Sequence, residues 1–124
     1  MTESPYASVS VGELVKRFEE TCLEQYDTYV TGDINLYNSG YDTQVDIVKE
    51  LTFRGPDARR SLMVLLTHEN PQVRLRAAKR VYPVAREEAR RCLEDLAASG
   101  WPDQSLAAGM TLSRLEDVPD CLDH

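Results

Sequence analysis

The sequence predicts an all-α protein of five to six helices. Three observations support this prediction: apolar residues recur every three to four positions, capping residues and glycines separate those stretches, and no segment alternates with a period of two. At 124 residues, with 42% hydrophobic and 28% charged residues, the composition is typical of one soluble globular domain. We therefore expect a single domain over residues 1–124, with a frayed N-terminus at 1–9 and a loose acidic tail at 118–124.

The first two helices are expected to form a long hairpin. Ser10 opens a capping box, the first helix runs to about residue 30, and Gly32-Asp33 ends it and caps the second helix. The second helix is expected over 34–53, with Ile34 first in its inward stripe. Gly40 interrupts that stripe without shifting its phase, which predicts one helix with a weak point, with a kink or a break as the alternatives.

The Gly55-Pro56 junction is the clearest boundary in the chain, because glycine commonly ends a helix and proline commonly begins one. A third helix is expected to end near His68, and a fourth to follow Asn70 over 71–81. A fifth helix is expected from Arg86 to Ser99 and a sixth from Gln104 to about Asp117. The inward face of the sixth helix is expected to consist of Leu106, Met110 and Leu115. Ala77 and Ala78 on the fourth helix are expected at close helix contacts.

Two resemblances follow from these residues. The stretch Asn70–Val81 is similar to the second helix of a HEAT repeat, with the core of the resemblance at 56–99. The chain from 12 to 117 also resembles a small bacterial family of HEAT-like proteins, the domain of unknown function numbered twenty-nineteen. The segments that suggest this family are Leu14–Phe18, Gly32–Ile34, Arg54–Arg60, Asn70–Val81 and Ala108–Leu112. The resemblance implies a short α-α superhelix (HEAT/armadillo-like) and no known catalytic residue. From the general kind of bacterial gene that encodes such proteins, it also implies a cytosolic immunity protein that neutralises a toxin.

Charge is unevenly distributed along the chain. Residues 1–53 have a net charge of −7, residues 54–91 of +6, and residues 92–124 of −6. The total of −7 argues against generic binding to nucleic acid or to an anionic membrane. The basic middle could pair with acidic residues inside the protein, or it could be one of two binding faces of opposite sign.

A helical wheel of the fourth helix predicts a basic face for a partner. Arg74 falls beside the apolar stripe, whereas Arg76, Lys79 and Arg80 fall on the other side and are expected to be exposed. The resemblance places this face in the concave groove of the repeat. Arg59 and Arg60 on the third helix are further candidates for the same binding surface.

No catalytic, cofactor-binding or metal-binding motif is present, and we expect neither an enzyme nor a cofactor. The apolar runs are shorter than the ~20 residues of a membrane span, the N-terminus does not resemble a signal peptide, and Cys22, Cys92 and Cys121 have no CxxC spacing, so a cytoplasmic protein is expected. The first functional hypothesis is a protein-binding module, with an immunity protein for a basic toxin as its narrower form. The alternative is a nucleic-acid-binding protein that uses the basic face. Four tyrosines with acidic residues between them would suit a basic partner: Tyr26, Tyr29, Tyr37 and Tyr41.

Overall fold

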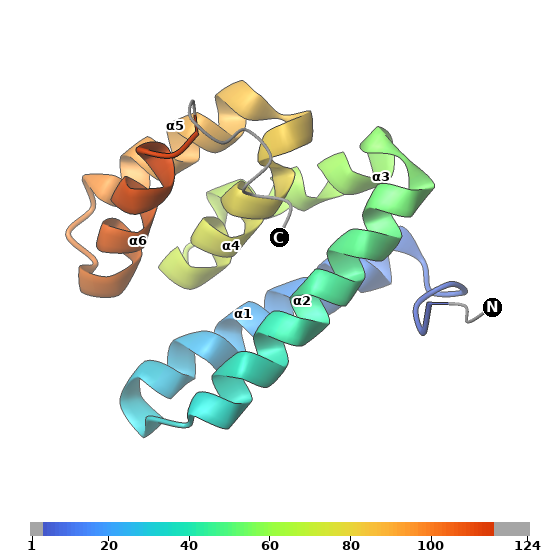
Figure 1. Cartoon of the computed structure of the whole chain (residues 1–124), viewed down its shortest axis with the longest axis horizontal. Coiled ribbons are helices and arrows are strands. Elements are labelled where there is room, and N and C mark those ends of the chain that lie inside the picture. Colours follow the sequence, from blue (N-terminus) through green and yellow to red (C-terminus); the bar gives the residue numbers. More distant parts are fainter. Residues whose placement is uncertain (1–3, 116–124) are drawn as a thin grey trace. The chain divides into compact units, whose positions relative to one another are not determined.

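The computed structural model describes residues 4–115, and within them the chain forms six α-helices, two 3-10 helices and no strand. The all-α prediction is confirmed. The chain divides into two compact units, Met1–Ser61 and Leu62–His124, and each is described by itself (Figure 1). The single-domain interpretation stays a prediction, and the expected tail at 118–124 lies outside the described residues.

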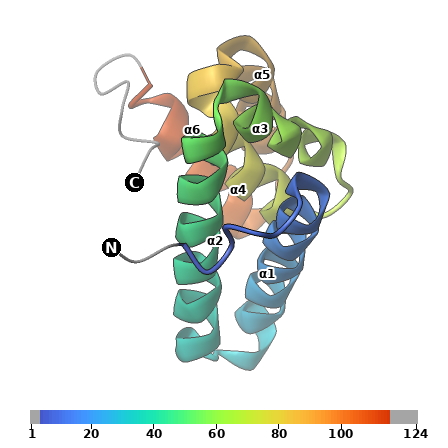
Figure 2. The ribbon, with the colours of Figure 1, turned by 90° about the vertical axis from the view of Figure 1, so that its right-hand side faces the viewer.

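The first unit is a hairpin of two long helices followed by a short third one. Its helices are α1 (Val11–Thr31), α2 (Ile34–Arg54) and α3 (Pro56–Arg60). Figures 1 and 2 show α1 and α2 side by side and running in opposite directions. Their facing stripes are fully buried at Leu14, Phe18, Cys22, Ile47 and Leu51. Burial of such apolar side chains, worth about 1.5–3 kcal/mol each, is what holds the hairpin together.

The predicted helix ends of the hairpin are confirmed. Ser10 Oγ accepts a hydrogen bond from Glu13 N at 3.2 Å, and Gly32 takes the left-handed conformation (φ 73°) that ends α1. Asp33 Oδ1 accepts from Leu36 N at 3.0 Å and caps α2. Gly55, at φ 116°, separates α2 from α3.

Gly40 lies inside the continuous helix α2 and is buried, so the helix does not break there. A Cβ at this position would lie 3.2 Å from Gln25 Cγ and 3.4 Å from the Thr21 carbonyl oxygen of α1. Glycine is therefore what allows the two helices to approach closely at this point, rather than a point of weakness.

The segment 4–9, part of the stretch 1–9 that we expect to fray, contains turns and is contacted by one arginine. Ala7 N donates to Ser4 O at 3.1 Å, and Arg54 Nη2 donates to Tyr6 O at 2.9 Å. Arg54 Nε also contacts Glu50 Oε2 at 2.8 Å, and this hydrogen bond holds the pKa of the Glu50 carboxyl below its ordinary value. The end of α2 thus holds the segment that precedes α1.

The second unit contains three α-helices that pack on one another. Its elements are the 3-10 helix η1 (Ser61–Thr67, which begins one residue before the unit), α4 (Pro71–Val81), the 3-10 turn η2 (Tyr82–Val84), α5 (Arg86–Ala97) and α6 (Pro102–Leu112). The expected third helix is only partly α-helical, since it becomes η1 after Arg60. Asn70 caps α4 as predicted, because its Oδ1 accepts from Gln72 N at 2.9 Å.

The inward face of α6 differs from the prediction at two of the three predicted residues, whereas the third, Leu115, is buried as predicted but lies after the end of the helix. Leu106 and Met110 are 67% and 52% exposed, whereas Gln104, Ala108 and Thr111 are buried. Gln104 Nε2 donates to Gln72 Oε1 of α4 at 3.0 Å. A buried glutamine whose amide is satisfied can occupy a core position, and apolar periodicity alone therefore indicates the wrong face.

Candidate functional site

The end of the α1–α2 hairpin exposes apolar side chains around a tight connection. Because Gly32 ends α1 and Asp33 caps α2 directly, the side chains on either side project beyond the packed part of the helices. Val30 is 91% exposed and Ile34 is 66% exposed. The prediction that Ile34 points inward is therefore wrong: as the first residue of α2 it lies beyond the α1–α2 contact. We call Tyr29, Val30, Ile34 and Tyr37 the hairpin tip.

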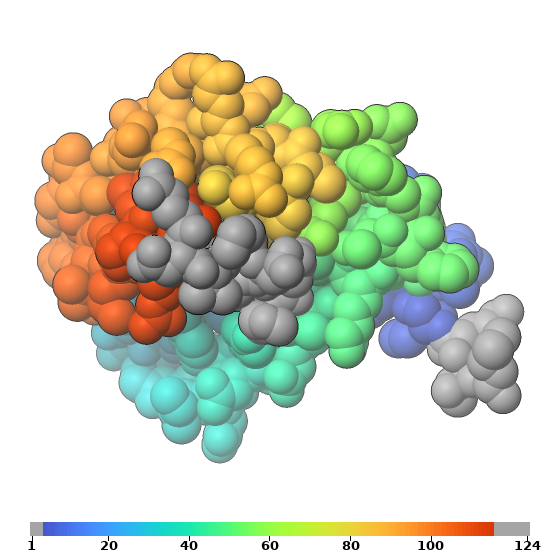
Figure 3. Space-filling view, turned by 45° about the horizontal axis from the view of Figure 1, so that its top comes forward, coloured from blue at the N-terminus to red at the C-terminus, as the bar shows by residue number. Residues whose placement is uncertain are grey.

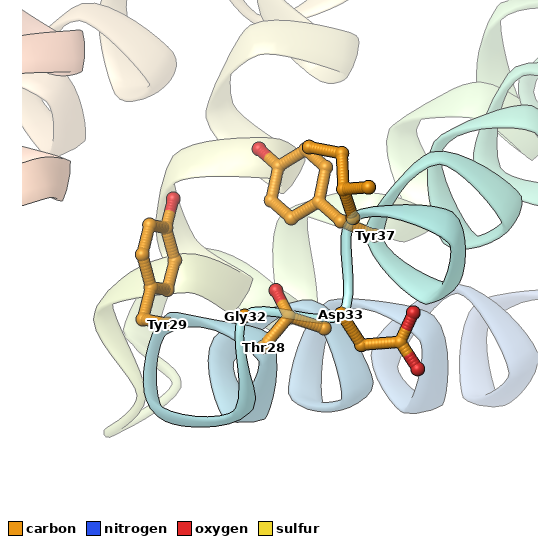
Figure 4. A pocket seen from close by; sticks show the side chains of 6 residues that line it. Thr28, Tyr29, Gly32, Asp33 and Tyr37 are labelled. Atoms are coloured by element: carbon orange, nitrogen blue, oxygen red, sulfur yellow. The ribbon is translucent and has the colours of Figure 1, made fainter.

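An open pocket of about 270 Å³ lies at the hairpin tip. It is lined by Thr28, Tyr29, Gly32, Asp33, Ile34 and Tyr37. Figure 4 shows the rings of Tyr29 and Tyr37 on one side of the connection, with the Asp33 carboxylate pointing away from them. The walls of the pocket are therefore mainly carbon, and its volume is just below the ~300–1,000 Å³ typical of small-molecule sites.

The tyrosines at the tip contact one another edge to face. The ring centroids of Tyr29 and Tyr37 are 6.1 Å apart at 79°, and those of Tyr26 and Tyr29 are 6.4 Å apart at 66°. This is the preferred arrangement for aromatic pairs. Tyr26, Tyr29 and Tyr37 therefore form one chain of ring contacts, and Tyr29 remains 45% exposed.

Buried amides fix the backbone beneath the pocket. Gln44 Nε2 donates to Gln25 Oε1 at 2.9 Å and to Thr21 Oγ1 at 3.1 Å, and all three residues are fully buried. Gln25 Nε2 in turn donates to the backbone carbonyl of Tyr37 at 3.2 Å. The hydrogen-bond chain therefore runs from the hairpin core to one wall of the pocket. The role of these glutamines is not predictable from the sequence, because polar residues on an apolar stripe give no periodic signal.

The basic face predicted on α4 is not exposed. Arg76 and Arg80 are 6% and 2% exposed, and Lys79 is half-buried. The helical wheel assumes one wet side, but nine of the eleven α4 residues are buried, so the helix has none. Arg74, expected at a buried edge, is half-buried, and its Nε is buried without a hydrogen bond to any of the described residues.

The two arginines of α3 differ from one another. Arg59 is only 5% exposed, whereas Arg60 is exposed and contacts Asp57 at 2.7 Å. Each of the five predicted basic residues has an interaction partner: Arg59, Arg60, Arg76, Lys79 and Arg80. Whether they bind a second molecule stays a prediction.

Chemically reactive groups in the described residues do not gather at the tip. Cys22 and Cys92 are buried and form no disulfide with any of the described residues, and burial raises the pKa of the Cys92 thiol to about 11. Between residues 4 and 115, no three His, Cys, Asp or Glu side chains are placed to share a metal ion. Within the same residues, no helix is both long and apolar enough to cross a bilayer. Cys121 lies outside the described residues.

Comparisons with known proteins are consistent with this architecture. The model of one family, "Domain of unknown function (DUF2019)", matches residues 12–116. The chain is also similar to a crystal structure of the protein RPA1889 from Rhodopseudomonas palustris CGA009, with 34% identity and a TM-score of 0.88 over 94% of this chain and 96% of that one. No curated protein matches the chain significantly.

Proposed function

This chain belongs to the DUF2019 family, and from that premise we propose that it is a non-catalytic protein-binding module whose contact surface is the hairpin tip. The observation that supports the proposal most directly is the exposure of Ile34, which lines the tyrosine-walled pocket, and of its neighbour Val30. Large apolar side chains that gather at one exposed place commonly mark interaction sites in soluble proteins.

The chemistry of the tip suits a protein partner. Tyrosines are enriched among the residues that dominate binding energy at protein interfaces, and they supply contact area at a low cost in side-chain entropy. Tyr29 and Tyr37 are already held against each other, and the Tyr37 backbone is fixed by Gln25, so little ordering is needed on binding. Some of the cyan atoms of this hairpin end are visible at the surface in Figure 3.

The narrower form of the proposal is a cytoplasmic immunity protein that neutralises a toxin. It is supported by the acidic first hairpin, which would attract a basic toxin. The alternative, nucleic-acid binding through the basic face, is less well supported because Arg76 and Arg80 are buried. A binding face for phosphates needs accessible cations.

The test compares two pairs of substitutions on tagged protein incubated with extract of the source cell. One variant carries Val30→Ser and Ile34→Ser at the tip. The control carries Leu106→Ser and Met110→Ser, which also removes exposed apolar groups, but from α6. Circular dichroism and urea unfolding establish that each variant is folded.

We expect at least one protein to be retained by the wild type and by the α6 control but lost by the tip variant. With that partner purified, the tip substitutions should weaken binding by about thirtyfold or more, since the loss of even one interface anchor costs about 2 kcal/mol or more. If every retained protein binds the tip variant as tightly as the wild type, the proposed surface is wrong.

A further inference from the structure

The hairpin tip lies within a long stretch of chain without a single cation. Between Arg17 and Lys49 there is no lysine or arginine, and the segment 18–48 carries seven carboxylates. They are Glu19, Glu20, Glu24, Asp27, Asp33, Asp42 and Asp46. Asp27 and Asp33 flank the tip and are exposed. The charged groups that this segment places around the apolar pocket are therefore all carboxylates.

The pocket and its surroundings differ in chemistry. The rings of Tyr29 and Tyr37 and the side chain of Ile34 make apolar walls, and the Asp33 carboxylate points out of the pocket while it caps α2 (Figure 4). An apolar group is favoured inside and a cation is favoured outside. A bare cation in the pocket would lose its hydration without gaining a carboxylate ligand.

We infer that the tip binds a basic segment of a partner protein, with one apolar side chain in the pocket and lysine or arginine on either side of it. This inference rests on the proposed function and names the chemistry of the partner. A second copy of this chain is disfavoured, because it would bring two negative tips together. Nucleic acids and anionic membranes are disfavoured for the same electrostatic reason.

The first experiment uses synthetic peptides as probes. The test peptide has a central leucine between two pairs of lysines; one control replaces the leucine by alanine, and another replaces the lysines by glutamates. Binding to the full chain is followed by NMR shifts of the Val30 methyls and the Tyr29 and Tyr37 rings. We expect the basic leucine peptide to shift these signals at low salt, the alanine peptide to bind more weakly, and the acidic peptide to leave them unchanged.

A charge-neutral variant tests the electrostatic part. Asp33→Asn retains an N-cap residue, since asparagine caps helices as well as aspartate does, and Asp27→Asn changes an exposed carboxylate on α1. The double variant should keep its fold and bind the basic peptide about three- to tenfold more weakly. Raising the salt from about 0.05 M to about 0.5 M should reduce wild-type binding and affect the variant less.

The outcomes separate this inference from the proposed function. If the basic peptide shifts no tip signal, or binds the double variant and the wild type equally, the inference is wrong. If a partner isolated from the cell nevertheless requires Val30 and Ile34, the proposed function stands without it. If, instead, every partner isolated from the cell binds the tip variant as tightly as the wild type, both are wrong.

Discussion

Gly40 and Gln25 touch across the α1–α2 hairpin so closely that a Cβ on Gly40 would lie 3.2 Å from Gln25 Cγ. The Gln25 side chain has little freedom to yield, because its amide bonds to the Tyr37 carbonyl and to Gln44. We therefore expect Gly40→Ala to lower the urea midpoint, although alanine would gain about 1 kcal/mol in helix propensity.

Gly109 provides the matched control for Gly40. It lies within α6 and is exposed, and beyond its own helix backbone none of the described atoms lies within 4 Å of the place that a Cβ would take. Gly109→Ala should stabilise the protein by about 0.5–1 kcal/mol. Equal effects of the two substitutions would show that Gly40 has no packing role.

Gln44 should contribute to stability through the hydrogen bonds that its side-chain amide donates to Gln25, Thr21 and, at 3.5 Å, the sulfur of Cys22. Gln44→Leu keeps a similar volume but leaves Gln25 Oε1 and Thr21 Oγ1 without this donor in a buried place. We expect a loss of about 1–3 kcal/mol in the free energy of unfolding. In a double-mutant cycle with Gln25→Leu, the second substitution should cost less than the first, and additive effects would exclude this coupling.

Ala77 is fully buried on α4, which confirms the prediction that it lies at a helix contact. Ala77→Leu should destabilise the protein by about 1–3 kcal/mol, because a larger side chain overpacks a site that is already filled. The control Ala98→Leu makes the same change at an exposed position after α5. An unchanged urea midpoint for Ala77→Leu would contradict this assignment.

Cys92 should be unreactive in the folded protein. Its thiol donates weakly to the carbonyls of Leu66 (3.6 Å) and Arg74 (3.8 Å), and burial raises its pKa to about 11. At pH 8 the thiolate, which is the nucleophile, is almost absent. A pulse of iodoacetamide followed by peptide mass mapping should label Cys92 slowly in buffer and rapidly in urea, and equal rates would contradict the burial of the thiol.

The same raised pKa predicts a loss of stability in base. The unfolded thiol ionises near pH 9, whereas the folded thiol stays protonated until about pH 11. Its contribution is therefore complete below pH 9 and is lost as the pH rises from about 9 to about 11. Cys92→Ala should remove this part of the pH dependence, which urea unfolding at a series of pH values would measure.

Short-range chemistry accounts for the expectations that are confirmed. Helix ends depend on hydrogen bonds within three or four residues, so Ser10, Gly32, Asp33 and Asn70 mark them without any tertiary contact. The charge pattern around the hairpin tip and the tyrosine cluster are also readable from residue order alone. Neither the charge pattern nor the order of the tyrosines shows which side chains are exposed to solvent.

Only the tertiary structure determines which side chains are buried by other elements. Arg76 and Arg80 are buried because α4 has no solvent-facing side. A helical wheel gives the directions of the side chains, but it does not show how many neighbouring elements pack around the helix. Likewise, Leu106 is exposed because a satisfied Gln104 takes the inward position on α6. Gly40, a weak point by helix propensity, is a contact point because a Cβ there would lie 3.2 Å from Gln25 Cγ of α1. Burial is a property of pairs of surfaces, whereas a helix cap is a property of one short segment.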